Sequence, residues 1–116
     1  MKKVLIVENE MRIRMAYANL LLMSGFQVVR ASSAWEAASI VIDETVDLIL
    51  LDIHMPETDG REFFDMVKEY NPHIKVMICS VEPIENQKTL IPQAVEYFDK
   101  SQGPKALLEK INSILL

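Results

Sequence analysis

Five short, largely apolar runs alternate with segments of helical spacing along the chain. Val4–Val7 and Leu48–Leu51 are apolar at every position, which is typical of parallel strands covered on both faces. Gln27–Ala31, Lys75–Cys79 and Val95–Phe98 are the other strand candidates. Because a helical pattern follows each run, the sequence predicts an α/β fold in which helices cover both faces of a five-stranded parallel sheet.

The helical segments show apolar faces and boundary signals. The predicted buried faces are Ile13, Ala16, Leu20 and Met23 in the first helix; Ala34, Ala37, Ala38, Val41 and Ile42 in the second; Phe63, Val67 and Tyr70 in the third; and Leu107, Leu108, Ile111 and Ile114 or Leu115 in the last. Ser33 with Glu36, and Asp59 with Glu62, have capping-box spacing, in which the glutamate returns to the amide of the capping residue. Pro92 lacks an amide hydrogen, so we expect a short or irregular fourth helix that ends near Ile91.

The composition narrows the class of protein. The chain has 116 residues, half of them hydrophobic, which suits one domain with a sizeable core and argues against disorder. A formal net charge of −5 without a basic run argues against nucleic acid or an anionic membrane as the main partner. The single cysteine excludes an internal disulfide, and the apolar run after Lys3 is too short for a signal peptide or a membrane span. We therefore expect one soluble, cytoplasmic domain.

Polar residues follow the predicted strands at the edge where a binding site is expected. In open α/β sheets, ligands bind outside the carboxyl ends of the strands, which for the order 2-1-3-4-5 lies between strands one and three. The residues at this edge are Glu8, Asn9, Glu10, Asp52, Ser80, Asp99 and Lys100. Each alone is more often a helix cap, a turn residue or a solvated charge. Together, oxygen ligands facing a lysine and a hydroxyl indicate a site for a hard cation and a phosphoryl group.

The aspartate in this set has the chemistry of a phosphoryl acceptor. A carboxylate can attack a phosphoryl group and form an acyl phosphate. The product would place about two negative charges beside Glu8, and each like-charge pair at ~4 Å costs on the order of 4 kcal/mol at an effective dielectric of ~20. Mg²⁺ and the ammonium of Lys100 are the candidates to offset that cost.

Several of these residues stand in motifs of a known family. The chain has Glu8-Asn9-Glu10 after its first strand, the stretch Asp47–Gly60 with the pattern D-L-I-L-L-D-I-H-M-P and a later D-G, then Ser80, and finally Tyr97-Phe98-Asp99-Lys100. These motifs resemble the receiver domain of two-component response regulators over essentially the whole chain. The resemblance implies a flavodoxin-like (βα)5 fold with sheet order 2-1-3-4-5.

The resemblance also implies roles for individual residues. Asp52 would be the phosphoacceptor, which takes a phosphoryl group from the phosphohistidine of a histidine kinase. Mg²⁺ would be held by Asn9, Asp52 and the backbone carbonyl of His54, with Glu8 acting through water. The remaining roles are phosphoryl contacts by Ser80 and Lys100, a switch role for Ser80 and Tyr97, and shaping of the loop after the acceptor by Met55-Pro56.

The sequence departs from the family at the site itself. Asn9 stands where the family usually has a second acidic residue, and its neutral oxygen is expected to weaken Mg²⁺ binding. Val81 stands where a small residue is usual, and its bulk is expected to narrow access to Asp52. Ser101 stands where the family usually has a proline after the lysine, and that proline helps to aim the lysine side chain. The chain between Ser80 and Tyr97 is shorter than usual, which predicts a modified signalling face.

Other functions remain as alternatives at this stage. The departures favour a degenerate receiver that binds a partner without phosphorylation. A flavin-binding protein would need a phosphate loop rich in Ser, Thr or Gly after the first strand, where Glu8-Asn9-Glu10 would repel phosphate. A phosphatase with an aspartyl nucleophile would need a second aspartate at position 54, which is histidine. A zinc site would need more ligands than His54 and His73 can gather.

The expected partners follow from the receiver interpretation. They are a sensor histidine kinase or phosphotransfer protein, and a downstream protein that binds the face formed by the fourth helix, fifth strand and last helix. We expect a receiver domain over residues 1–116 with no output domain in this chain, and no direct contact with nucleic acid or membrane. Such a domain is no enzyme for external substrates and catalyses only transfer to, and hydrolysis from, its own Asp52.

Overall fold

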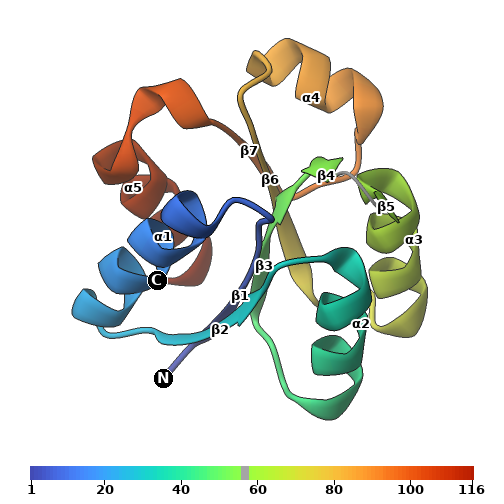
Figure 1. The fold of residues 1–116 in the computed structure, drawn as a ribbon, viewed down its shortest axis with the longest axis horizontal. Helices are drawn as coiled ribbons and strands as arrows, with labels where there is room; N and C mark the ends of the chain where they lie inside the picture. Colours follow the sequence, from blue (N-terminus) through green and yellow to red (C-terminus); the bar gives the residue numbers. More distant parts are fainter. Residues whose placement is uncertain (56–57) are drawn as a thin grey trace.

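Five parallel strands form a central sheet in the order β2-β1-β3-β6-β7, which confirms the predicted topology (Figure 1). The strands of the sheet are β1 (Lys3–Val7), β2 (Gln27–Ala31), β3 (Leu48–Asp52), β6 (Lys75–Ser80) and β7 (Glu96–Asp99). The helices are α1 (Met11–Met23), α2 (Ala34–Asp43), α3 (Gly60–Tyr70), α4 (Ile84–Leu90) and α5 (Pro104–Leu115), and a 3-10 helix spans Lys100–Gln102. An unpredicted antiparallel pair, β4 (His54–Met55) with β5 (Thr58–Asp59), follows β3.

The structure, a computed structural model, describes residues 1–55 and 58–116, with the backbone alone at residues 58 and 59. The predicted role of Pro56 in the loop after Asp52 lies outside the described residues, as does the side chain of Asp59, the predicted cap of α3. Within this part of the chain, no helix is long and apolar enough to cross a membrane.

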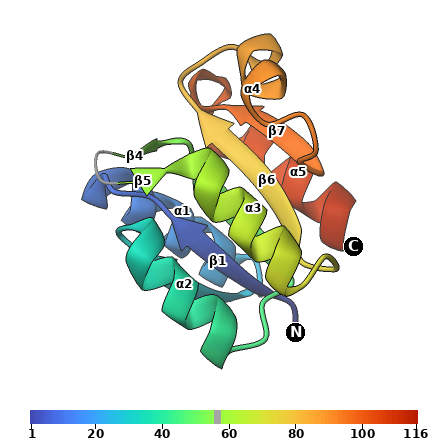
Figure 2. The same cartoon turned by 90° about the vertical axis from the view of Figure 1, so that its right-hand side faces the viewer.

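The helices cover both faces of the sheet, with α1 and α5 on one face and α2 and α3 on the other (Figures 1 and 2). Alternate residues of each strand point to opposite faces, so the core divides into two layers. Leu5, Ile49 and Ile78 pack toward α2 and α3, whereas Ile6, Leu50 and Met77 pack toward α1 and α5. Burial on both faces explains why β3 is apolar from Leu48 to Leu51.

The fourth helix is short, as predicted. It spans seven residues, Ile84–Leu90, and Ile91 is its C-cap. Pro92 follows directly and cannot donate to the preceding turn, which explains the end point. The helix packs against β7, the strand that precedes Lys100 of the predicted site.

The buried faces of three helices differ from the prediction. In α1 the structure buries Ala18 and Leu21, whereas Met23 of the predicted face is 88% exposed. Apolar residues occur on every side of α1, so spacing alone does not identify the side that meets α5. Ile42 in α2 and Tyr70 in α3 are also exposed, and each is one of the last two residues of its helix.

The capping box of α2 forms with a different partner. Ser33 Oγ accepts a hydrogen bond of 3.1 Å from the Glu36 amide, as predicted. The Glu36 carboxylate returns to the amide of Ser32 at 3.3 Å rather than to Ser33. The box therefore also fixes the residue that precedes the cap.

Candidate functional site

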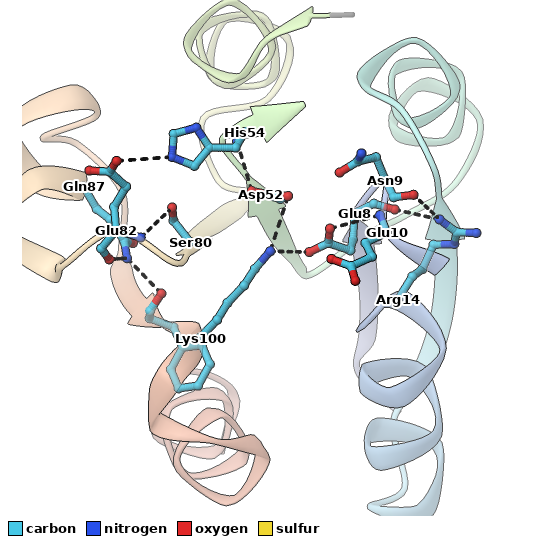
Figure 3. A network of polar contacts seen from close by, with 11 residues as sticks. Glu8, Asn9, Glu10, Arg14, Asp52, His54, Ser80, Glu82, Gln87 and Lys100 are labelled. Carbon is cyan, nitrogen blue, oxygen red and sulfur yellow. Dashed lines mark hydrogen bonds and ion pairs between the residues drawn. The ribbon is translucent and has the colours of Figure 1, made fainter. Parts of the chain in front are cut away.

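The carboxyl ends of the strands bring most of the predicted residues together. Glu8 follows β1, Asp52 ends β3, and Lys100 follows β7. These three side chains and those of Asn9 and His54 line a cavity of about 300 Å³ (Figure 3). Residues separated by more than ninety positions therefore converge at one edge of the sheet, as the sequence predicts.

Two buried carboxylates share one lysine in this cavity. Lys100 Nζ lies 2.6 Å from Glu8 Oε1 and 3.3 Å from Asp52 Oδ2. Glu8 is 3% exposed and Asp52 is 4% exposed. With all three groups ionised, this cluster carries one negative charge that nothing within it neutralises. Burial of an uncompensated charge is costly, so the cluster favours a cation in the adjoining cavity.

The ionisation of the cluster reflects this imbalance. Burial raises the pKa of Glu8, the negative charge of Asp52 raises it further, and the hydrogen bond from Lys100 opposes the rise. Burial alone would lower the pKa of Lys100, but the hydrogen bond to Glu8 and the charges of both carboxylates outweigh it and raise that pKa. Lys100 is therefore held as an ammonium that faces both acids.

Backbone amides orient both carboxylates. Asp52 Oδ1 accepts a hydrogen bond of 2.9 Å from the His54 amide, and Glu8 Oε2 accepts one of 3.2 Å from the Glu10 amide. In each case the donor is two residues after the acid, so the loop that follows the strand fixes its side chain. Asp52 Oδ2 is the oxygen that faces Lys100, and Oδ1 is held by the loop.

Arg14, which the sequence analysis did not identify, secures the loop after β1. Its guanidinium donates to the Glu8 carbonyl at 2.8 Å and to the Asn9 carbonyl at 3.4 Å (Figure 3). These bonds link the first turn of α1 to the loop that carries Glu8 and Asn9. The sequence contains no signal for this role, because the acceptors are backbone atoms whose positions depend on the loop.

The lysine reaches its partners without the proline that usually follows it in the family. Asp99 Oδ1 accepts hydrogen bonds from the Ser101 amide at 2.9 Å and from Ser101 Oγ at 2.8 Å. These bonds cap the 3-10 helix that begins at Lys100, and they lower the pKa of Asp99. The local turn thus aims Lys100 into the cavity, and Ser101 does not turn the lysine away from the acids.

The loop after Asp52 is held close to α3 by a glycine. A Cβ built on Gly60 would lie 3.0 Å from the backbone Cα of Ile53. No side chain fits there without a shift of the loop, which gives a structural reason for the glycine of the D-G motif.

Ser80 lies behind the cavity rather than on its lining. It is fully buried, and its Oγ accepts a hydrogen bond of 3.1 Å from the Glu82 amide. Glu82 Oε1 in turn lies 3.6 Å from His54 Nε2, so the two loops beside Asp52 meet through side chains (Figure 3). Val81 lines the cavity and is 72% exposed, which places its bulk at the mouth.

Tyr97 is separate from the cavity. Its ring is buried, its hydroxyl donates to the Ile91 carbonyl at 2.5 Å, and Lys88 Nζ lies 5.8 Å from the ring centroid. Burial raises the pKa of this hydroxyl. The predicted switch residue therefore contacts the end of α4 and not the acids.

The donor set fits a magnesium ion better than a transition metal. Among the described residues, no group of three or more His, Cys, Asp or Glu side chains is arranged to hold a metal. Mg²⁺ is usually bound by one or two carboxylates with several retained waters. The cavity offers the carboxylates of Asp52 and Glu8, the Asn9 side chain and the loop at His54, together with an excess of negative charge.

Comparison with known proteins finds matches to response regulators. Residues 4–112 match the family model described as the response regulator receiver domain. The phosphate regulon transcriptional regulatory protein PhoB of Pseudomonas aeruginosa is 30% identical over 118 residues, which cover 98% of this chain and 52% of PhoB. This chain spans about half the length, or less, of the first curated relatives it matches.

Solved structures show the same fold. The chemotaxis protein CheY4 of Vibrio cholerae has a TM-score of 0.92 and 25% identity, with 99% of each chain covered. The response regulator TrrA of Thermotoga maritima, determined in complex with Mg²⁺ and BeF, has a TM-score of 0.90 and 27% identity, with 99% of this chain and 100% of that chain covered. Together with the strand order and the acidic cluster, these matches show that this chain belongs to the receiver domain family of two-component response regulators and has its flavodoxin-like fold.

Proposed function

We propose that the domain is a phosphoacceptor in a two-component system and that Asp52 is the modified residue. The observation that carries this proposal is the shared ammonium of Lys100, which lies against both buried carboxylates at an accessible cavity. In the transfer, an Asp52 carboxylate oxygen attacks the phosphorus of a phosphohistidine. The P–N bond breaks, its electron pair stays on the imidazole nitrogen, and that nitrogen takes up a proton.

The charges around Asp52 explain why a cation is needed. Phosphorylation exchanges one carboxylate charge for about two phosphoryl charges beside Glu8. Lys100 offsets one unit of the resulting charge and leaves about two. A divalent ion held by Asn9, Asp52 and the His54 carbonyl, with Glu8 contributing through water, would bring the cluster close to neutrality.

The remaining roles are assigned by position. Lys100 would contact the phosphoryl group from β7, and Ser80 would donate its hydroxyl proton to a phosphoryl oxygen after a shift toward Asp52. Tyr97 would respond to that shift through α4, since its hydroxyl donates to the carbonyl of Ile91, the C-cap of that helix. The donor would be a histidine kinase or a phosphotransfer protein, and the downstream partner would bind the face of α4, β7 and α5.

A direct test measures phosphate on Asp52. Incubation with acetyl phosphate or a histidine kinase at millimolar Mg²⁺ should give a hydroxylamine-labile phosphate that maps to Asp52 by mass spectrometry. The Asp52→Asn variant should give none. Absence of the modification from the wild-type protein with both donors would overturn the proposal.

One observation favours a second candidate, a receiver that signals without phosphorylation. Asn9, which lines the cavity, supplies a neutral oxygen where an acid would strengthen the metal site. If the domain works in this way, Asp52→Asn will retain full activity in the cell. Loss of activity in that variant would exclude this candidate.

A further inference from the structure

Gln87 is a fully buried polar side chain in α4 that the phosphoacceptor proposal does not use. Its Nε2 donates to the Glu82 carbonyl at 2.8 Å and to the Phe98 carbonyl at 2.9 Å. Glu82 belongs to the loop between β6 and α4, and Phe98 lies in β7, two residues before Lys100. One amide group therefore joins three segments that adjoin the site (Figure 3).

The orientation of this amide is determined by its partners. Two carbonyl oxygens face it, so the NH₂ group and not the oxygen must point toward them. Gln87 Oε1 is left as the one buried side-chain N or O atom without a hydrogen-bond partner in the described part of the chain. An unsatisfied buried acceptor is costly. The presence of a glutamine at this buried position is therefore better explained by the two carbonyl groups that its Nε2 group binds than by its packing.

These hydrogen bonds form a continuous path from the site to α4. Ser80 Oγ accepts from the Glu82 amide, and the Glu82 carbonyl accepts from Gln87. At the other end of α4, the Tyr97 hydroxyl donates to the Ile91 carbonyl. The helix is thus held to β7 at its central residue, by Gln87 through Phe98, and just beyond its last residue, by Tyr97 through Ile91.

We propose that Gln87 is a positioning residue that couples Ser80 to α4. This inference rests on the phosphoacceptor proposal. A Ser80 hydroxyl that moves toward a phosphoryl group on Asp52 either leaves the Glu82 amide or draws Glu82 with it. Both movements change the position of the Glu82 carbonyl, which Gln87 links to α4 and to β7. Gln87 holds Glu82 and α4 in this arrangement, restrains the movement of Ser80, and transmits that movement to the helix when the site is occupied.

Wild-type protein provides the first test, through the side-chain amide protons of Gln87 in NMR spectra. Both protons should exchange slowly, because both are buried and donated to carbonyls. Addition of Mg²⁺ with beryllofluoride, a phosphoryl mimic, should shift their resonances together with the amide of Glu82. Shifts at Asp52 and Lys100 without any change at Gln87 would overturn the inference alone. Absence of shifts throughout, including Asp52 and Lys100, would overturn the proposed function as well.

The Gln87→Met variant provides the second test. It keeps the length of the side chain and removes both donors. We expect the mimic still to shift Asp52 and Lys100, while the shifts within Ile84–Leu90 fall to less than half of their wild-type size. Because the restraint on Ser80 is released, the mimic should bind about fivefold more tightly, at the lower end of typical coupling.

A matched control separates this coupling from a general effect on α4. Asn86 lies beside Gln87 and donates to the Glu82 carboxylate at 3.0 Å on the exposed surface. The Asn86→Ala variant removes a contact to the same residue but leaves the buried path intact, so its α4 response should match the wild type. Equal α4 responses in Gln87→Met and wild type would overturn the inference. If Gln87→Met does not fold, the side-chain amide measurement in wild-type protein decides the question.

Discussion

Lys100 Nζ and Glu8 Oε1 lie 2.6 Å apart although 92 positions separate the two residues in the chain. The contact joins the ends of β1 and β7, the first and last strands in the chain, across β3 and β6. Asp52, on β3, is the second carboxylate on the same ammonium.

Replacement of Lys100 by methionine tests that balance through stability. The variant leaves Glu8 and Asp52 buried and facing each other without a cation, which should cost about 3–5 kcal/mol in the free energy of unfolding at neutral pH. Lys3→Met is the matched control. It breaks the exposed Lys3–Glu44 pair, which spans 3.1 Å, and should cost less than about 1 kcal/mol.

The loss of stability in Lys100→Met, relative to the wild type, should depend on pH. The pKa of Lys100 is raised in the folded protein, so Lys100 stays charged at and below neutral pH, and its own deprotonation removes its contribution only above that raised pKa. Without Lys100, the hydrogen bond that opposes the raised pKa of Glu8 is gone. The Glu8 carboxyl then takes up a proton at higher pH, and protonation relieves the repulsion. Urea unfolding from pH 7 toward the ordinary Glu pKa of 4.5 should show the deficit shrinking, and a constant deficit would contradict this account.

The Asn9→Asp variant tests the weakened metal site. A carboxylate at position 9, in addition to the acids that already line the cavity, should raise Mg²⁺ affinity on the order of tenfold, or about 1.4 kcal/mol, measured by calorimetric titration. The same change should lower stability in metal-free buffer because it adds a like charge. Asn71→Asp adds the same charge after α3, away from the cavity, and should leave Mg²⁺ affinity unchanged. Equal affinities in wild type and Asn9→Asp would show that position 9 does not contact the ion.

The fold was predictable from the sequence to the extent that local patterns determine it. The apolar strands and the proline after Ile91 predict the parallel sheet and the length of α4 without reference to distant residues, whereas the strand order came from the family resemblance. The side of α1 that is buried was not predictable, because it depends on the contact with α5. Ala18 and Leu21 are buried there, and spacing alone favoured a different face.

The residues of the candidate site likewise fall into those that the sequence could predict and those that it could not. Glu8, Asp52 and Lys100 could be grouped because each ends or follows a parallel strand, and topology alone brings such positions to one edge. Arg14 and Gln87 could not be found, since both act on backbone carbonyls whose positions exist only in the folded chain. Every residue type has a backbone carbonyl, so a side chain that binds one leaves no pair of residue types that a sequence pattern could reveal.

Removal of the Arg14 guanidinium tests the importance of the loop after β1. In Arg14→Ala the Glu8 and Asn9 carbonyls lose their donor, and the loop should hold both side chains less firmly. We expect a stability loss of about 1–3 kcal/mol and a clear fall in the rate of phosphorylation by acetyl phosphate. Arg12→Ala, an exposed change on the same turn of α1, should alter neither quantity. Equal phosphorylation rates in the two variants would mean that the loop keeps its form without Arg14.

Tyr97→Phe isolates the second link between α4 and β7. The variant keeps the buried ring and removes the hydroxyl that donates to the Ile91 carbonyl. Loss of one buried hydrogen bond should lower stability by about 1 kcal/mol. Phosphorylation of Asp52 should proceed at the wild-type rate, because Tyr97 does not line the cavity. Hydrogen exchange at the end of α4 should become faster, since Ile91 would then be held by α4 and packing alone. Unchanged exchange there would mean that the hydroxyl is not needed to hold this end of the helix, where Arg61 also donates to the Leu90 carbonyl at 3.0 Å.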